Sequence, residues 1–177
     1  IGGSSPNSIA IGNQYAFVSN ATNDNISVID YRTGKIVKHI QLQITPVLDS
    51  VRGYLPFGIT LSPDQKKLYV ALLGLNAVAV VDIENSRVEG LIPTGWGPTR
   101  VQQDAKGEHL FIVSCRGFGA GPNGGANFKA PIQGTYVGDI QLATLQYLDT
   151  PSAAELKEYT NNVLSYTFKN YRSGNDN

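Results

Sequence analysis

The 177-residue chain lacks methionine, has a single cysteine and carries no net charge. Its 14 Lys and Arg residues match its 14 Asp and Glu residues, so no net field favours nucleic acid or an anionic membrane. One thiol excludes an internal disulfide, and the apolar run before Cys115 predicts a buried or partly buried structural thiol. No run approaches the roughly 20 apolar residues of a membrane span. Because the chain starts at Ile1 without methionine, we expect a processed or trimmed piece of a longer protein.

One stretch of this sequence is present three times. Residues 55–72 align without a gap on residues 97–114, and a shorter copy begins at Pro6. Pro56 and Pro98 occupy the same place in the two longer copies. A repeat spacing of about 40 to 50 residues is typical of propeller blades or solenoid units, and not of a domain built around a single core.

Within each copy, apolar residues alternate with others, which predicts β-strands instead of helices. The second copy shows this at Ile59 and Leu61, and again from Leu68 to Leu72. Two further strand patterns and a polar turn complete each unit, giving four antiparallel strands. An aspartate ends the third strand in the first two copies, as Asp30 and Asp82. Because the residue recurs, we expect it to cap the following turn and not to act in catalysis.

Serial four-stranded sheets rich in β-branched and aromatic residues indicate a β-propeller. We therefore predict an all-β fold for residues 1–177: a propeller segment of about three four-stranded antiparallel blades, forming an incomplete ring, with one C-terminal helix. The predicted bounds are about 6–42, 55–93 and 97–148 for the blades, about 152–164 for the helix and 169–177 for a flexible tail. Unpaired blade edges attract other chains. We expect a second copy or an adjoining domain to cover them.

The third unit departs from the repeat at a Gly-rich insertion over residues 117–135. A loop of this length is unusual and often carries function. Its glycines fit neither GxGxxG nor GxxxxGKS spacing, which argues against a phosphate-binding loop. Two interpretations stay open: a plain surface loop, or a docking loop for an adjoining domain or a ligand. The strand pattern resumes at about residues 136–145.

The predicted helix has a capping box at its start, formed by Ser152 and Glu155. Apolar and small residues then follow on one face, including Leu156, Val163 and Leu164. This stripe predicts packing over a blade edge or, alternatively, a contact between domains.

The repeats resemble those of YncE-like propellers, which carry YVTN-type motifs. The resemblance rests on residues 15–20 followed by 26–30, and on residues 68–71 followed by 77–82. The third copy is similar to one subgroup through three further features, which are residues 94–99, the insertion from Gly117 to Gly125, and residues 153–160. In that subgroup the propeller precedes a metal-dependent, alkaline phosphatase-like phosphoesterase domain. The resemblance covers about residues 6–116, and about residues 6–168 with the subgroup features.

This resemblance implies an exported protein, periplasmic or on the cell surface, with any signal peptide upstream of Ile1. It also implies that catalysis in such relatives lies outside these 177 residues, because no phosphoesterase motif is present in the chain.

The sequence offers no catalytic constellation, and we predict no cofactor and no metal. His39 and His109 lie in similar strand contexts of different blades, without the spacing of metal ligands. In propellers, the residues after each recurrent proline begin the strands that line the central channel. This places candidate ligand- or partner-binding side chains at the channel and in the insertion. They are Arg100, Trp96, Phe57, Arg116, Phe118 and Asn123. Trp96 could instead pack between blades, whereas a charged Arg100 needs a partner or water.

The sequence therefore predicts a noncatalytic propeller scaffold that binds a partner protein, a glycan or an adjoining domain. The alternative is an accessory propeller that positions substrate for a metal-dependent phosphoesterase domain outside this chain.

Overall fold

The computed structural model describes residues 4–46, 51–119, 121, 127–136 and 140–168. Its strands form three antiparallel sheets, two with four strands and one with three. The strands are β1 (Pro6–Ile11), β2 (Tyr15–Asn20), β3 (Asn25–Asp30), β4 (Lys35–Gln41), β5 (Pro56–Leu61), β6 (Lys67–Leu72), β7 (Ala77–Asp82), β8 (Arg87–Pro93), β9 (Trp96–Gln103), β10 (His109–Gly117) and β11 (Thr144–Asp149). A short 3-10 helix (Ala21–Asn23) and the helix α2 (Ala153–Thr167) complete the described elements.

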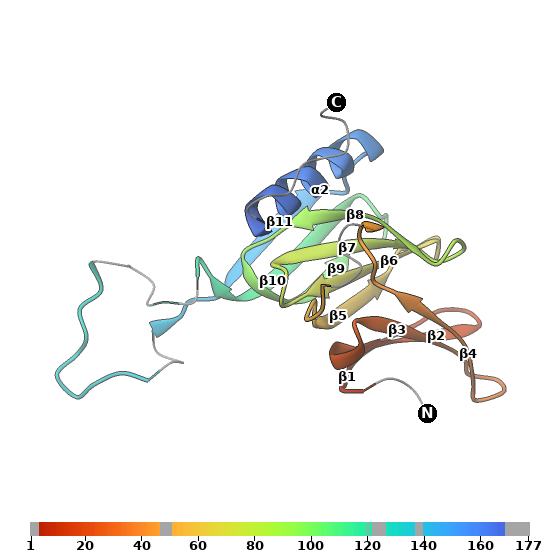
Figure 1. Cartoon of the computed structure of the whole chain (residues 1–177), viewed down its shortest axis with the longest axis horizontal. Coiled ribbons are helices and arrows are strands. Elements are labelled where there is room, and N and C mark those ends of the chain that lie inside the picture. Colours follow the sequence, from red (N-terminus) through yellow and green to blue (C-terminus); the bar gives the residue numbers. More distant parts are fainter. Residues whose placement is uncertain (1–3, 47–50, 120, 122–126, 137–139, 169–177) are drawn as a thin grey trace.

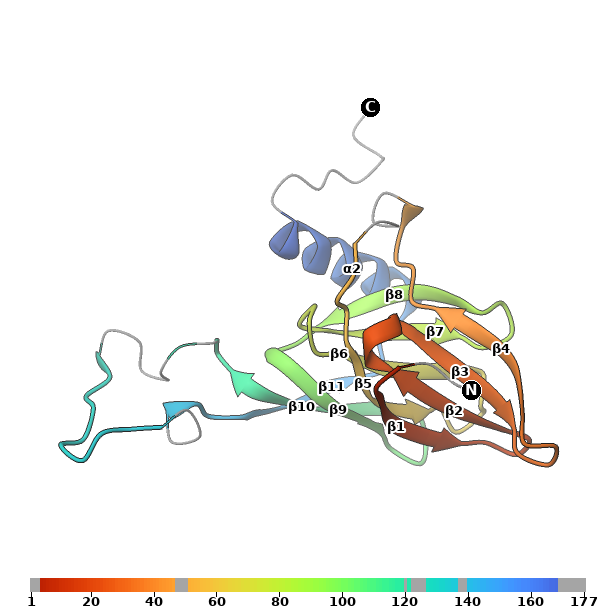
Figure 2. The same cartoon turned by 60° about the horizontal axis from the view of Figure 1, so that its bottom comes forward.

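Each sheet is one blade of an incomplete propeller. Blade one is β1 to β4, blade two is β5 to β8, and blade three is β9 to β11. The first strands β1, β5 and β9 lie next to one another, and the three sheets stack side by side around them (Figures 1 and 2). In the described residues the blades do not close into a ring. The prediction of tandem antiparallel blades is therefore confirmed.

Two apolar clusters join the three blades. The first lies between blades one and two and includes Phe17, Ile26, Ile59 and Leu68. The second lies between blades two and three and includes Tyr69 from one side with Val101, Leu110 and Ile112 from the other. The middle blade is therefore covered on both faces, which explains why β6 and β7 are almost fully buried.

A repeated hydrogen bond ties each of the first two blades to the next one. Asp24, just before β3, accepts bonds from the backbone N–H groups of Leu55 (2.9 Å) and Gly53 (2.7 Å). Asn76, just before β7, accepts one from the N–H of Gly97 at 2.8 Å. Asp24 and Asn76 both adopt positive φ, which Asp and Asn tolerate better than most residues. The side chain at this position therefore holds the residue that precedes the next recurrent proline.

The turn after the third strand is capped as predicted. The carboxylate of Asp30 accepts hydrogen bonds from the N–H groups of Arg32 and Thr33. The carboxylate of Asp82 accepts one from the N–H of Asn85. Both aspartates thus have a structural task, and the interpretation that they recur for this reason is confirmed.

Blade three differs from the prediction in two respects. Its sheet has three strands in the described part of the chain, where we expected four. The strand after the insertion begins at Thr144, later than the expected start near residue 136. The segment after Asp149 carries a helical apolar period, so a fourth strand cannot form there and α2 follows instead. Residues 127–136 project away from the blades (Figure 1), and the predicted tail, 169–177, lies outside the described residues.

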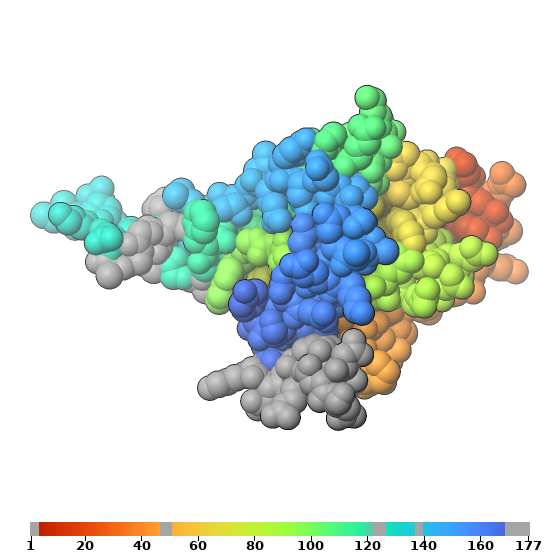
Figure 3. Space-filling model, turned by 90° about the horizontal axis from the view of Figure 1, so that it is seen from above, coloured from red at the N-terminus to blue at the C-terminus, as the bar shows by residue number. Residues whose placement is uncertain are grey.

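Helix α2 starts at the predicted capping box, where Ser152 and Glu155 bond each other's backbone N–H groups. It lies on the outermost strand of blade two, β8, and its surface is prominent in Figure 3. A Cβ on Gly90 would come within 2.6 Å of Leu156 and Thr160, so glycine permits this close approach. Thr160 Oγ1 accepts a hydrogen bond from the N–H of Leu91 at 2.9 Å. The helix thus covers a blade edge, as predicted.

Among the described helices, none combines the length and the apolar character needed to cross a bilayer.

Candidate functional site

The register of the strands shows which residues of the three blades are equivalent. Residues Lys67 and His109 begin the second strand of their blades, and each pairs with the last residue of the third strand. Counting on by two residues makes Tyr69 of blade two equivalent to Phe111 of blade three. Residue Phe17 holds this position in blade one. In blades one and two this aromatic side chain faces the next blade, and in blade three it lies on the face turned away from blade two.

This face is buried in blade two and open in blade three. Tyr69 is 3% exposed beneath blade three, whereas Phe111 is 38% exposed. The same contrast holds across the face. Ala71, Val78 and Val80 of blade two are buried, whereas their equivalents in blade three are exposed. These equivalents are Val113, Leu145 and Tyr147. We call this surface the open flank of blade three; it comprises Arg100, Phe111, Val113, Leu145 and Tyr147.

The aromatic side chains of this flank already contact one another. The rings of Phe111 and Tyr147 lie 5.2 Å apart, and the imidazole of His109 stacks on Tyr147 at the same distance. Leu145 is 68% and Tyr147 58% exposed. Four neighbouring apolar side chains on two paired strands form a contiguous apolar patch, which is typical of an interaction site.

Arg100 lies on the open flank because β9 contains a bulge. Arg100 pairs with Val113, whereas the next residue of β10, Ser114, pairs with Pro98, so Thr99 is the extra residue. In a regular strand Trp96 and Arg100 would share one face. The bulge places them on opposite faces, and sequence reasoning had grouped them at one channel.

Trp96 points instead toward blade two and the end of α2. It is 46% exposed and lines a pocket of about 400 Å³ together with Asn76, Thr94 and Tyr166. Arg116 and Phe118 lie across the strand pair from Trp96, where the insertion leaves β10, and both are exposed.

The two remaining predicted residues lie elsewhere. Phe57 is on β5, half-buried, and its backbone carbonyl accepts a hydrogen bond from Ser19 Oγ at 2.7 Å. Asn123 lies outside the described residues. The structure therefore divides the five candidates that it describes over separate places, with Arg100 on the open flank and Trp96 in a pocket.

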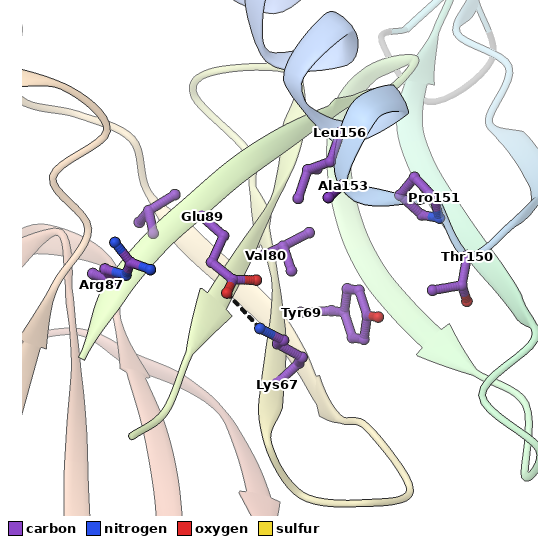
Figure 4. Close-up of a pocket in the computed structure, with 10 residues that line it drawn as sticks. Lys67, Tyr69, Val80, Arg87, Glu89, Thr150, Pro151, Ala153 and Leu156 are labelled. Carbon is purple, nitrogen blue, oxygen red and sulfur yellow. Dashed lines mark hydrogen bonds and ion pairs between the residues drawn. The ribbon is translucent and has the colours of Figure 1, made fainter. Parts of the chain in front are cut away.

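A second pocket, of about 540 Å³, lies between blade two and the start of α2 (Figure 4). Its walls include Tyr69, Val80 and Leu156, and an ion pair between Lys67 and Glu89 closes one side. Burial raises the pKa of Tyr69. The pocket is bounded by strands of blade two and by the segment from Thr150 to Leu156 that follows the last strand of blade three. Sequence reasoning missed it because it depends on contacts between segments far apart in the chain.

One group of titratable residues lies at the turn between β9 and β10. Asp104, Glu108 and His109 bring three potential metal-ligand atoms within 4.8 Å of one another. Asp104 is already engaged, because it accepts bonds from the N–H groups of Glu108 and His109 and contacts His109 Nδ1 at 3.0 Å. The side-chain hydrogen bond with His109 lowers the pKa of Asp104 to about 2 and raises that of His109. This geometry is that of a capped turn.

Two sequence-based expectations are wrong. Cys115 is exposed, because side chains alternate along β10 and Cys115 lies on the exposed side with Phe111 and Val113, opposite the buried Ile112 and Ser114. The two histidines are not in similar contexts either. His39 lies on the outermost strand of blade one and contacts Ser27 Oγ, whereas His109 begins the second strand of blade three.

Comparisons with known proteins bear on the fold. No protein-family model matches the chain, and no curated protein matches its sequence. A solved structure of hydrazine synthase from Kuenenia stuttgartiensis is similar at 23% identity, with a TM-score of 0.54 over 62% of this chain and 29% of that one. A catalytically inactive virginiamycin B lyase from Staphylococcus aureus, solved with quinupristin, is similar at 20% identity and a TM-score of 0.50, covering 63% and 35% of the two chains. Both neighbours are propeller-like, and the matched part spans about a third of their lengths.

Proposed function

We propose that this chain is a noncatalytic propeller scaffold, and that it binds a protein partner through the open flank of blade three. The observation that carries the proposal is the contrast between equivalent positions. Tyr69, Val78 and Val80 are buried by the next blade, while Phe111, Leu145 and Tyr147 are exposed. The open flank has the same kind of side chains that blade two uses to contact blade three. Another blade or an adjoining domain could therefore pack on it.

The experiment compares the wild-type chain with the double variant Leu145→Glu/Tyr147→Glu. We expect the wild-type protein either to bind the apolar dye bis-ANS or to self-associate, and the variant to lose most of that signal. Ile132→Glu is the matched control, because Ile132 is fully exposed on the insertion. Circular dichroism checks that the sheets are intact. If dye binding and association are both unchanged in the double variant, the open flank is not a binding surface.

A glycan is the second candidate ligand, supported by the pocket at Trp96. Exposed aromatic rings beside amide and hydroxyl groups are suited to sugars, and Trp96, Tyr166, Asn76 and Thr94 provide this combination. Titration calorimetry with soluble tetrasaccharides of glucose and of N-acetylglucosamine tests it. We expect binding that Trp96→Ala abolishes and that Phe118→Ala leaves unchanged, since Phe118 lies outside the pocket. If no sugar gives a heat of binding, a glycan is excluded as the ligand of this pocket.

The alternative role is that of an accessory propeller for an exported, metal-dependent phosphoesterase. It is supported by the resemblance of the third repeat to propellers that precede such a domain. On this proposal the chain positions substrate and performs no chemistry itself. We expect no hydrolysis of p-nitrophenyl phosphate with zinc or manganese added. Turnover that disappears in His109→Ala would contradict the noncatalytic assignment. An envelope location, periplasmic or on the cell surface, belongs to the same proposal and is tested by fractionating the source cells.

A further inference from the structure

Blade one also has an open face, on the side opposite to blade two. Ile9 and Ile11 of β1 are exposed there, with Val18 of β2 paired to Ile9. Residue Ile9 is equivalent to Ile59 of blade two, because Ile59 pairs with Val70 as Ile9 pairs with Val18. We call Ile9, Ile11 and Val18 the open flank of blade one.

The positions of this flank are the ones that blades two and three use to pack on the preceding blade. In blade two they are filled by Ile59 and Val70, which are buried against blade one. In blade three they are filled by Val101 and Ile112, which are buried against blade two. Blade one therefore carries apolar, mostly β-branched side chains at these positions too, and Ile9 and Ile11 are exposed in the part of the chain that the structure describes.

The two open flanks are complementary halves of one recurring contact. The flank of blade three provides the aromatic half, with Phe111 in the place of Tyr69 and Phe17. The flank of blade one provides the aliphatic half, with Ile9 in the place of Val101. Within one chain these flanks lie at opposite ends of the blade series (Figures 1 and 2), so two chains are needed to join them.

Arg100 modifies this contact at the first strand. It stands where blade two has Gly58, whose added Cβ would meet the carbonyl oxygen of Thr99 at 2.4 Å. The equivalent of Thr99 on blade one is Asn7, which is exposed. Ser8 holds the position of Gly58 in blade one, and its hydroxyl accepts a bond from the N–H of Ile59 at 3.4 Å. In blade one, a serine side chain at this position is thus compatible with blade packing and forms a polar bond across the contact.

We propose that two copies of this chain associate head to tail, with the open flank of blade three of one copy on the open flank of blade one of the other. The Arg100 guanidinium then donates to the backbone carbonyl or the amide oxygen of Asn7 in the second copy. Two such contacts close a ring of six blades, within the range of four to eight that propellers adopt. The inference rests on the proposed function, since it names the partner of the same flank.

Multi-angle light scattering over a concentration series measures the association directly. We expect a mass of twice the 19.0 kDa of one chain at high concentration and no larger species. A mass of one chain at every concentration overturns the proposal. A mass that grows without limit overturns the closed pair, because a head-to-tail contact that does not close produces filaments.

Two variants distinguish this arrangement from others. Leu145→Glu/Tyr147→Glu removes the flank of blade three, and Ile9→Glu/Ile11→Glu removes the flank of blade one. All four side chains are exposed in the single chain, so both variants are expected to fold. Each alone should dimerise about 100-fold more weakly than wild type, because a carboxylate is buried without a partner. Ile132→Glu is the control and should dimerise normally.

Mixing the two variants gives the sharpest result. Each still has one intact flank, and these two flanks fit each other, so the mixture should form a mixed pair that neither variant forms with itself. If Ile9→Glu/Ile11→Glu dimerises as well as wild type, the contact joins two flanks of blade three and the head-to-tail arrangement is wrong.

Failure of this inference and failure of the proposed function give different results. A monomeric chain whose bis-ANS binding is lost in Leu145→Glu/Tyr147→Glu retains a free binding flank and excludes only the second copy. A monomeric chain without flank-dependent dye binding contradicts both.

Discussion

Blade two and blade three are built from the same repeat but differ in what surrounds them. Blade two has four strands, a neighbour on each face and α2 over its outermost strand. Blade three has three strands in the described residues, a long insertion before its last strand, and one uncovered face. The apolar side chains at equivalent positions are buried in one blade and exposed in the other. The repeat therefore fixes the fold of a blade, and its neighbours decide which positions stabilise the fold and which are free to bind.

The largest expected difference between the blades is at the shared aromatic position. Tyr69→Ala should lower the free energy of unfolding by about 3–5 kcal/mol, because it leaves a cavity between two blades. Phe111→Ala should cost about 1 kcal/mol or less, because its ring loses mainly the contact with Tyr147. Urea unfolding of the dilute, single chain measures both. Equal losses would show that the two faces are covered alike.

Gly58 and Arg100 hold equivalent positions, but there is no room for a side chain at Gly58, whereas the side chain of Arg100 is exposed. Gly58→Ala should destabilise by about 3 kcal/mol, near the upper end for overpacking, because the obstacle is the backbone oxygen of Thr99. Gly121→Ala, with nothing within 4 Å of its added Cβ, is the control and should change little. Thermal unfolding reports both changes. A neutral Gly58→Ala would mean that β5 and β9 are not in close contact.

The side chain of the residue before the third strand should stabilise the fold in blades one and two but not in blade three. Asp24→Ala removes a charged acceptor from two N–H groups of the next blade and should cost about 2 kcal/mol. Asn76→Ala should cost less, since one bond is lost. Ala143, at this position in blade three, has no acceptor, so Ala143→Ser should be neutral. Unfolding in urea ranks the three variants; the reverse order would contradict the repeated hydrogen bond between blades.

Much of the blade architecture was predictable because it is local. Alternating residues specify strands, the recurrent Asp30 and Asp82 specify turns, and Ser152 with Glu155 specifies the start of a helix. The missing fourth strand was not anticipated, although the helical period after Asp149 was recognised. The prediction of four strands in blade three followed from the expectation that every repeat is complete, and this expectation took precedence over the helical period. The position of α2 over β8 depends on a contact between distant segments, which periodicity does not contain.

The candidate site was predicted only in part. Arg100 was identified from its departure from the repeat, and it lies on the open flank. Trp96 was grouped with it as a neighbour of the residues that follow the recurrent proline, but the bulge at Thr99 separates their faces. Phe111, Leu145 and Tyr147 were missed, since an apolar alternation looks the same whether the face is buried or open. Comparing each residue with its equivalent in blade two would have placed these three on one face.

The smallest expected effect concerns pH at the turn between β9 and β10 of blade three, where Asp104 and His109 stand in the places of Ser62 and Lys67 of blade two. The raised pKa of His109 means that its contribution to stability is full below pH 6.5 and is lost as the pH rises through the folded value. The lowered pKa of Asp104 contributes above pH 3.8 and is lost as the pH falls toward about 2. Asp104→Asn should lower the pKa of His109, as an NMR titration of the imidazole measures. An unchanged titration would contradict the hydrogen bond.

Hydroxyl-radical footprinting of the aromatic side chains tests the central claim most directly, because it reads the exposure of Tyr69, Phe111 and Tyr147 in one sample. In dilute protein, the account predicts rapid modification of Phe111 and Tyr147 with protection of Tyr69, and protection of all three when the concentration is raised. Modification of Tyr69 as fast as Phe111 would contradict the stacking of blade three on blade two.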